Sequence, residues 1–255
     1  SLTAEKISSF AERLTKLKNS LIDMDIEIGW WTSTLKCGPN PYEKTSPEYD
    51  SYDYQRITDI SGAISPISAC PLDRNFIENF VGGIKEVVSV AHPFLVQFED
   101  DYELSNHGVV RCGCFCPLHL SSFAERVGKL YSREELLEIF KRADRESARL
   151  RRQWAENSRD SMVALSRSVR RGIDEADGSV RACLCQPGVT DQDGDLTLPV
   201  AKALAGERLR PMIRVYGTSY SSDDPVSIPT TTFHMLYTSQ HSPPEYELYH
   251  ESDTY

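Results

Sequence analysis

The sequence has few basic residues relative to its acids, no long apolar run and no glycine-rich phosphate loop. Its 28 Lys and Arg are outnumbered by 38 Asp and Glu, giving a net charge of −10. This balance argues against nucleic acid as a partner, because phosphate binding needs clustered cations. No stretch approaches the roughly 20 apolar residues of a membrane span, and the first residues do not resemble an export signal. No internal repeat and no nucleophile elbow for Ser, Lys or Cys is recognisable.

Cysteine is present in an odd number, which does not fit a complete set of disulfides. Of the seven cysteines, three fall in Cys112-Gly113-Cys114-Phe115-Cys116. Cysteines two residues apart on an extended segment are badly placed to bridge each other. Free or metal-bound thiols fit better, so the sequence favours a reducing compartment, and we expect a cytoplasmic protein.

Most of the chain shows either helical or strand periodicity. The capping box Ser132-Arg133-Glu134-Glu135 places a helix start at Ser132. Because five strands alternate with helices and no tandem hairpins are evident, parallel βα units are predicted. The predicted helices are 7–21, 75–90, 118–127, a long region from 132 to about 172, and 198–204; the predicted strands are 25–31, 94–102, 180–185, 210–216 and 246–251.

The expected architecture is a single domain over 1–255. It is an α/β fold, a (β/α)8 TIM barrel that is incomplete, with about strands 3 to 7 present. Residues 37–59, rich in Pro, Tyr, Asp and Ser without sustained period, are predicted to form a long aromatic loop. Residues 105–119 are predicted to form a cysteine-rich loop.

Acidic residues follow two of the predicted strands. The apolar run 94–98 ends in Glu99-Asp100-Asp101, and the last strand ends near Glu251. Alternation along the two strands predicts that Asp101 and Glu251 both point into a shared mouth at the carboxyl ends. Two opposed carboxylates are the machinery of glycoside hydrolysis. The alternative is that these acids are solvated or cap the following helices.

A second cluster has the spacing of a metal site. Cys114-Phe115-Cys116-Pro117-Leu118-His119 is a Cys-x-Cys-x-x-His arrangement, with Cys70 as an upstream ligand and Cys112 as an alternative. Thiolate and imidazole ligands suit tetrahedral zinc, and four protein ligands would make that zinc structural. The alternative is a loop of buried, reduced thiols. No organic cofactor is expected.

Two of these segments resemble the glycoside hydrolase family 42 β-galactosidases and related clan-A barrels. Gln97-Phe98-Glu99-Asp100-Asp101-Tyr102 is similar to the family's Gln-x-x-Asn-Glu-Tyr on the fourth strand, and 114–119 is similar to its Cys-x-Cys-x-x-Cys zinc segment. The resemblance makes 25–31, 94–102 and 246–251 the third, fourth and seventh strands. It implies that Asp101 is the acid/base, that Glu251 is the nucleophile and that Cys70 is the upstream zinc ligand.

The chain departs from the family pattern at the proton donor. Asp100-Asp101 replaces Asn-Glu, which shortens the donor and removes the amide that binds the sugar 2-hydroxyl. A misplacement of about 1 Å can cost 10²-fold in rate, so Glu99 or Asp100 could instead be the donor.

The sequence therefore predicts a retaining, β-galactosidase-like glycoside hydrolase. We expect a carbohydrate substrate as its partner and neither nucleic acid nor a membrane. The protein could form a homo-oligomer. One alternative is a non-catalytic carbohydrate-binding relative. Another is a metal-dependent hydrolase that uses Asp100, Asp101 and His107. The residues expected to shape the sugar site are Trp31, Glu99, Asp100, His107 and Asp253.

Overall fold

The fold is described from a computed structural model of the 255-residue chain. The structure describes residues 4–32, 35, 53–100, 102–104, 113–186, 195–215, 233, 236–237 and 239–249. Among these residues, no helix combines the length and the apolar character needed to cross a membrane.

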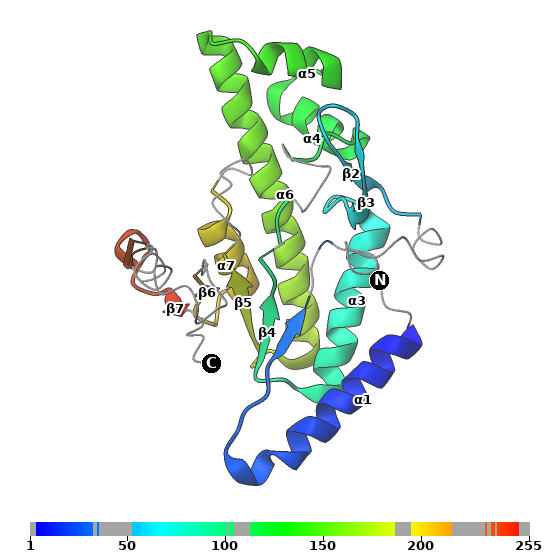
Figure 1. Ribbon diagram of the computed structural model, residues 1–255, viewed down its shortest axis with the longest axis vertical. Helices are drawn as coiled ribbons and strands as arrows, with labels where there is room; N and C mark the ends of the chain where they lie inside the picture. Colours follow the sequence, from blue (N-terminus) through cyan, green and yellow to red (C-terminus); the bar gives the residue numbers. More distant parts are fainter. Residues whose placement is uncertain are drawn as a thin grey trace, which may run out of the picture.

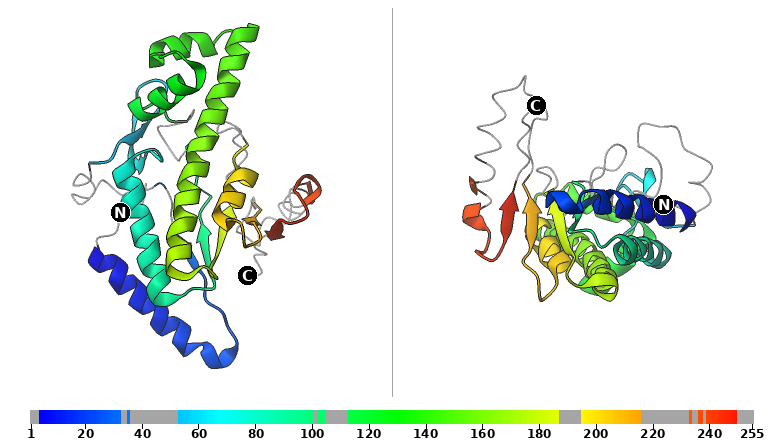
Figure 2. Two further views of the ribbon diagram at one scale, coloured as in Figure 1. Left: turned by 180° about the vertical axis from the view of Figure 1, so that it is seen from behind. Right: turned by 90° about the horizontal axis from the view of Figure 1, so that it is seen from below.

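Five parallel strands form one sheet in the order β1-β4-β5-β6-β7. Helices α3 (Arg74–Ala91), α6 (Arg145–Asp177) and α7 (Thr197–Ala205) cover one of its faces; the sheet lies in front of them in Figure 1 and behind them in the left view of Figure 2. The predicted α/β class with parallel strands is confirmed, whereas barrel closure remains a prediction. The strands are β1 (Trp30–Thr32), β4 (Leu95–Phe98), β5 (Arg181–Cys185), β6 (Met212–Arg214) and β7 (Glu247–Tyr249), and each overlaps its predicted range.

The two faces of the sheet differ in chemistry, as the alternation along the strands predicts. The face toward the helices is apolar and contributes to the main hydrophobic core, through Val96, Phe98, Ala182, Leu184 and Ile213. The alternate residues lie on the other side of the sheet, which we call the opposite face. It carries Leu95, Gln97, Arg181, Cys183, Cys185, Met212, Arg214 and Glu247.

Several helices begin at residues whose side chains cap them. The predicted capping box is confirmed at α5 (Arg133–Phe140), where Ser132 and Glu135 each bond the other's backbone N–H. The Asp73 carboxylate accepts the Phe76 N–H at the start of α3, and the Asp144 carboxylate accepts the Ser147 N–H at the start of α6. Each cap satisfies a helical N–H that has no partner within the helix.

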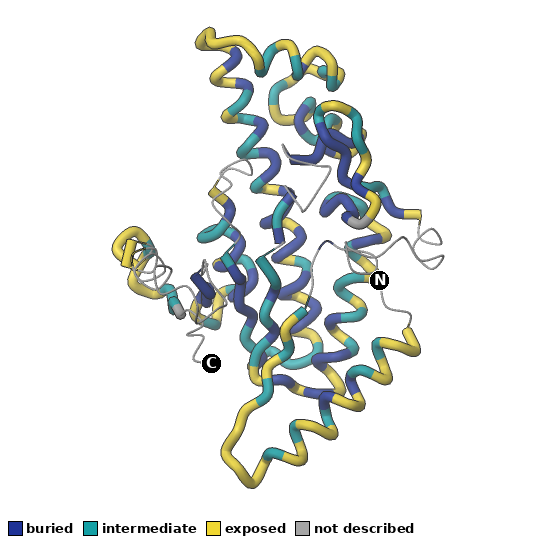
Figure 3. Tube along the Cα trace, in the orientation of Figure 1, coloured by how far each residue is buried: buried dark blue, intermediate teal, exposed yellow. Residues whose placement is uncertain are grey.

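α1 (Ala4–Ser20) packs across α3, and the short helix η1 (Ile22–Met24) connects it toward β1. α4 (Pro117–Val127), α5 and the first half of α6 form a separate aromatic cluster at the top of Figure 1, in which Trp154 stacks on Phe115 with 4.2 Å between ring centroids. The first turns of α6 are largely exposed, and the helix becomes buried where it meets the sheet (Figure 3). α6 therefore links the aromatic cluster to the main core.

The structure corrects the end of the predicted loop at 37–59, because residues 56–58 form a strand; residues 37–52 lie outside the described residues. It also contains a hairpin that the sequence did not predict. Strands β2 (Arg56–Thr58) and β3 (Ile64–Ala69) pair as an antiparallel hairpin. In its turn, the Asp59 carboxylate accepts the Ser61 N–H at 3.0 Å, and Gly62 has a φ of 92°. An aspartate side chain that accepts the N–H two residues later, and a glycine with positive φ, are both common features of turns. Neither was recognised from the sequence here.

The structure also corrects the long helical region predicted from Ser132 to about Gly172. It consists of two helices, α5 and α6, which are separated between Phe140 and Arg145, and α6 continues to Asp177. The break coincides with the Asp144 cap of α6, which the sequence reading also overlooked.

Candidate metal centre and candidate active site

Four buried ligand groups converge beside the helical part of the molecule. Cys70 follows β3, Cys114 and Cys116 lie just before α4, and His119 is in the first turn of α4. The Sγ atoms and one His119 ring nitrogen all lie within 4.8 Å of one another, and all four side chains are buried. The structure therefore brings together the four residues named from the sequence; Cys112, the alternative ligand, lies outside the described residues.

Three of the distances within this Cys3His centre lie close to the edges of a tetrahedron around a metal ion. Zn–S bonds of about 2.3 Å and Zn–N bonds of about 2.0 Å imply ligand separations of about 3.5 to 3.8 Å. The Sγ atoms of Cys70 and Cys116 are 3.5 Å apart, and His119 Nδ1 lies 3.2 Å and 3.8 Å from those two sulfurs. Since both sulfurs belong to free cysteines, the donor set fits zinc and not a disulfide.

The four ligand groups strongly perturb one another's pKa values. Burial raises the pKa of the Cys70 thiol well above its ordinary value, and hydrogen bonds with Cys114 and Cys116 raise it further. Burial also raises the pKa of Cys114, but hydrogen bonds from the other two thiols and the charge of His119 outweigh burial and hold that pKa well below its ordinary value. Burial lowers the pKa of His119, yet the Cys114 thiolate raises it to about 10. A divalent ion that bound these ligands would displace the protons on the thiols and on the ring nitrogen that faces them.

Backbone contacts position the ligands. Cys116 is the N-cap residue of α4 and Pro117 follows at the first helical position, which fixes where His119 falls. The Leu72 N–H donates to Cys70 Sγ at 3.4 Å, and the Phe115 N–H donates to the Thr58 carbonyl of β2 at 2.6 Å. The hairpin missed by the sequence reading thus holds the segment that carries two of the ligands.

The candidate active site lies at the carboxyl end of the sheet. Glu99 directly follows β4, and its N–H donates to the Thr32 carbonyl of β1 at 3.1 Å. The Asp100 N–H donates to Glu99 Oε1 at 2.9 Å, and the Tyr102 N–H donates to the Glu99 carbonyl at 3.1 Å. The chain therefore turns after Phe98, and the strand alternation used to orient the acids ends at Glu99.

Tyr102 anchors the chain just after the acids. It is fully buried, and its ring lies 5.4 Å from that of Phe98. Its hydroxyl donates to Ser166 Oγ of α6 at 3.0 Å, because the single O–H of Ser166 donates to the Met162 carbonyl at 2.7 Å. Burial raises the pKa of the Tyr102 hydroxyl. The acidic segment therefore starts and ends on residues that are fixed in the main core.

The sequence reading missed a buried cation at this end of the sheet. Arg214 ends β6, is only 2% exposed, and donates to Cys185 Sγ at 3.7 Å. Its guanidinium carbon lies 5.8 Å from the ring centroid of Trp31, within range of a cation–π contact. Burial raises the pKa of Cys185, the charge and hydrogen bond of Arg214 oppose that rise, and Cys183 and Glu99 add to it. An arginine within the apolar run 211–215 was the signal available in the sequence.

The other predicted site residues divide into two groups. Trp31, half-exposed, and the partly buried Glu99 and Asp100 lie at the carboxyl end as predicted. Asp101, His107, Glu251 and Asp253 lie outside the described residues.

β7 has the orientation that the sequence alternation predicted. Its Leu248 packs against the main core. Glu247, on the opposite face, forms an ion pair of 2.6 Å with Arg181. That pair lies toward the amino ends of the strands, away from the acids.

A cavity lies at the amino end of the sheet. It has a volume of about 420 Å³ and is lined by residues that include Lys18, Asp25, His92 and Asp177. Parallel α/β folds place their reactive groups at the carboxyl ends of the strands, so we do not assign catalysis to this cavity.

The fold is similar to that of solved β-galactosidases. The crystal structure of the β-galactosidase from the psychrophilic Marinomonas ef1 matches with a TM-score of 0.61 and 14% identity, over 89% of this chain and 39% of that chain. The β-galactosidase from Bacillus circulans sp. alkalophilus matches with a TM-score of 0.49 and 13% identity, over 76% of this chain and 31% of that chain. No protein-family model and no curated protein sequence matches.

At these identities the similarity shows a shared fold and does not identify family 42. The chain spans 39% of the length of the Marinomonas protein. Within the described residues, the Cys3His centre is the one cluster of His, Cys, Asp or Glu side chains with ligand atoms close enough to hold a metal ion.

Proposed function

We propose that the chain forms part of the catalytic (β/α)8 barrel of a retaining glycoside hydrolase that acts on O-glycosidic bonds, as β-galactosidases do. The observation that carries this proposal is the match to the Marinomonas β-galactosidase over 89% of the chain with a TM-score of 0.61. The sheet supports it as well, because its strands are parallel and one face packs on helices. A TM-score of 0.61 at 14% identity is expected where a fold is kept while its sequence changes.

The catalytic roles follow from the carboxyl ends of the strands. Glu99 and Asp100 lie at that end of β4, Asp101 continues the acidic run, and Glu251 follows β7 in sequence. Asp101 would donate the proton to the leaving oxygen, and Glu251 would attack the anomeric carbon. Glu99 or Asp100 is the alternative donor. A separation of about 5 to 5.5 Å between the two carboxyls corresponds to retention of configuration.

The remaining groups at the mouth would shape the sugar site. The half-exposed Trp31 offers an aromatic face for a sugar ring, and Arg214 lies against that indole. His107 and Asp253 complete the set assigned to substrate.

Hydrolysis of aryl glycosides by the full-length protein tests the proposal. Asp101→Asn and Glu251→Gln should each lower kcat/KM by about 10²- to 10⁴-fold, the range expected for loss of a positioned catalytic carboxyl group. Glu175→Gln, which removes a carboxylate on the outer surface of α6, is the matched control and should leave the rate unchanged.

Two outcomes would contradict this assignment. Full activity in both variants would remove the catalytic roles of Asp101 and Glu251. Sugar binding by calorimetry, with no hydrolysis of any glycoside tried, would instead identify a non-catalytic carbohydrate-binding relative, which the Asp100-Asp101 replacement makes the natural second candidate.

The Cys3His centre would hold a structural zinc ion. Cys70, Cys114, Cys116 and His119 supply four buried ligands whose ligand atoms lie within 4.8 Å of one another. With four protein ligands no position remains open for water, so zinc here would join β3, the cysteine segment and α4 without entering the reaction.

Elemental analysis of the purified protein tests the zinc assignment. One zinc per chain is expected, and Cys116→Ser should abolish it. Cys183→Ser, at a buried cysteine of β5 outside the cluster, should retain the metal. Absence of zinc from the wild-type chain, together with no zinc uptake on titration, would overturn the assignment.

A further inference from the structure

His119 makes a second contact that faces away from the thiols. Its Nδ1 lies 3.2 Å from Cys70 Sγ, whereas its Nε2 lies 3.1 Å from the hydroxyl oxygen of Ser161 on α6. Ser161 is 4% exposed and His119 is fully buried, so water does not compete for this contact. The imidazole therefore connects the thiol cluster to the long helix.

The direction of the hydrogen bond between these two residues follows from what Ser161 does with its one hydrogen. The Ser161 hydroxyl donates to the Ser158 carbonyl at 2.7 Å, and a carbonyl can only accept. A serine hydroxyl has a single O–H donor, so the 3.1 Å contact must be donated by Nε2–H of His119. A neutral imidazole with its proton on Nε2 has its lone pair on Nδ1, the atom that faces the sulfurs.

We infer that Ser161 is a positioning residue for the metal centre. It holds His119 in the tautomer and ring orientation that present Nδ1 to the ion. This inference rests on the zinc site proposed above. A histidine ligand needs such an outer partner because two ring nitrogens could bind, whereas a cysteine offers only one sulfur. Ser161 thus orients His119, the ligand that takes the place of the last cysteine of a Cys-x-Cys-x-x-Cys segment.

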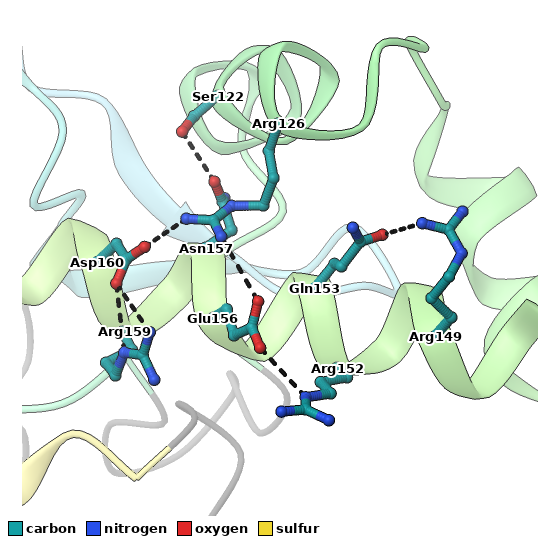
Figure 4. A network of polar contacts seen from close by, with 9 residues as sticks. All are labelled: Ser122, Arg126, Arg149, Arg152, Gln153, Glu156, Asn157, Arg159 and Asp160. Atoms are coloured by element: carbon teal, nitrogen blue, oxygen red, sulfur yellow. Dashed lines mark hydrogen bonds and ion pairs between the residues drawn. The ribbon is translucent and has the colours of Figure 1, made fainter.

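The helices that carry the two residues are fixed to each other by a separate network (Figure 4). Arg126 of α4 forms ion pairs with Glu156, at 3.6 Å, and with Asp160 of α6. Nearby, the Ser122 hydroxyl donates to Asn157 Oδ1 at 2.9 Å. Because these contacts set the spacing of α4 and α6 independently, loss of the Ser161 hydroxyl should free the ring without separating the helices.

Zinc competition with a chromophoric chelator, using the full chain, measures the effect. Ser161→Ala should weaken zinc binding by about 10- to 100-fold, as found for lost outer-shell partners. Ser122→Ala is the matched control: it removes another serine hydrogen bond between the same helices, touches no ligand, and should leave the zinc affinity unchanged. Circular dichroism confirms that both variants fold.

A double-mutant cycle separates positioning from general destabilisation. In the His119→Cys background the centre keeps four ligands, and the thiolate has no second ring nitrogen to orient. Ser161→Ala should then change the zinc affinity by about twofold or less, because its effect passes through the imidazole. Cobalt absorption spectra report the ligand set in each variant.

The outcomes distinguish the two proposals. If the wild-type chain binds zinc and Ser161→Ala binds it equally tightly, the role of Ser161 is wrong and the zinc site stands. The same conclusion follows if Ser161→Ala costs as much in the His119→Cys background as in the wild type. If the wild-type chain takes up no zinc, the proposed site and the inference both fail.

Discussion

The Cys3His centre and the carboxyl end of the sheet are assembled in different ways. At the centre, three of the four ligands fall within 114–119, and one more residue, Cys70, completes the set. At the carboxyl end, the groups that meet come from four strands: Trp31 from β1, Glu99 after β4, Cys185 from β5 and Arg214 from β6. The first site depends mainly on local chain geometry, and the second depends on the sheet.

The contact between Arg214 and Trp31 shows how much the sheet contributes. Strands β4 and β5 separate β6 from β1, so three spacings of about 4.8 Å, or about 14 Å along the sheet, lie between them. A guanidinium 5.8 Å from the indole centroid therefore requires the two side chains to reach toward each other across the opposite face. A sheet that is concave on that face would bring them together, and such curvature would be needed for barrel closure.

The largest expected change in the free energy of unfolding comes from removing metal from the Cys3His centre. If zinc binds at the Cys3His centre with a free concentration near 1,000 times Kd, chelation should lower the free energy of unfolding by about 4 kcal/mol. For a chain of this size, that corresponds to a fall in Tm of about 10 °C or more. Thermal unfolding with and without chelator measures it.

The control for chelation is a variant that has already lost the centre. Cys116→Ser should be less stable from the outset and insensitive to chelator, while Cys183→Ser should keep the full chelator effect. An identical unfolding curve for the wild type in both buffers would mean that the centre is not stabilised by metal, and the contrast with the sheet end would disappear.

At the carboxyl end the expected loss is smaller and involves a single cation. Arg214→Met keeps much of the side-chain volume but removes the buried guanidinium, and should lower the free energy of unfolding by about 1.5 to 3 kcal/mol, the range for hydrogen bonds to charged groups. Arg181→Met is the matched control on the same face. Because Arg181 and its partner Glu247 are partly exposed, its loss should cost about 1 kcal/mol or less.

Chemical denaturation of the two arginine variants gives the comparison. Equal costs for Arg214→Met and Arg181→Met would show that burial of Arg214 adds nothing to stability. The tryptophan emission should change more in Arg214→Met, since Arg214 lies against Trp31.

The sequence predicted the sheet well and the hairpin poorly, for a physical reason. Strand β4 alternates between partly buried and buried residues, so the burial of Val96 and Phe98 appears as a period of two, whereas β5 and β6 are short, continuously buried runs. Strand β2 has only three residues, and the six-residue β3 contains Pro66, which weakens the pattern. Their pairing depends on the turn at Asp59 and Gly62. That turn can be predicted from its Asp and Gly residues, but not from hydrophobic periodicity.

The same distinction explains the sites. Cys114, Cys116 and His119 were predicted because ligand spacing along the chain is a local property, and Cys70 followed as the upstream thiol. Arg214 was missed because nothing near it in sequence indicates that Cys185 and Trp31 will surround it. Ser161 was missed for the same reason, since its partner His119 lies 42 residues away along the chain.

The smallest predicted loss of stability is at an ion pair at the amino end of the sheet, outside both the Cys3His centre and the carboxyl end. It serves as the baseline for comparing those two regions. The Ser179 hydroxyl and then His92 lower the pKa of Asp177 to about 2, with His92 Nδ1 2.8 Å from the carboxylate. Because the folded pKa lies below the unfolded value of about 3.9, this stabilisation is complete above pH 5 and is lost as pH falls toward 2.

Asp177→Asn measures this baseline. Since the carboxylate is partly exposed and screened, the variant should be less stable than the wild type by only about 1 kcal/mol at pH 6, and the difference should vanish near pH 2. Ser179→Ala should lose part of the same stabilisation over the same pH range. If the stability difference did not depend on pH, the loss in Asp177→Asn would come from packing and not from the charge of Asp177. A cost as large as that of Arg214→Met would mean that an ordinary ion pair matters as much as the buried cation, and that the carboxyl end is not exceptional.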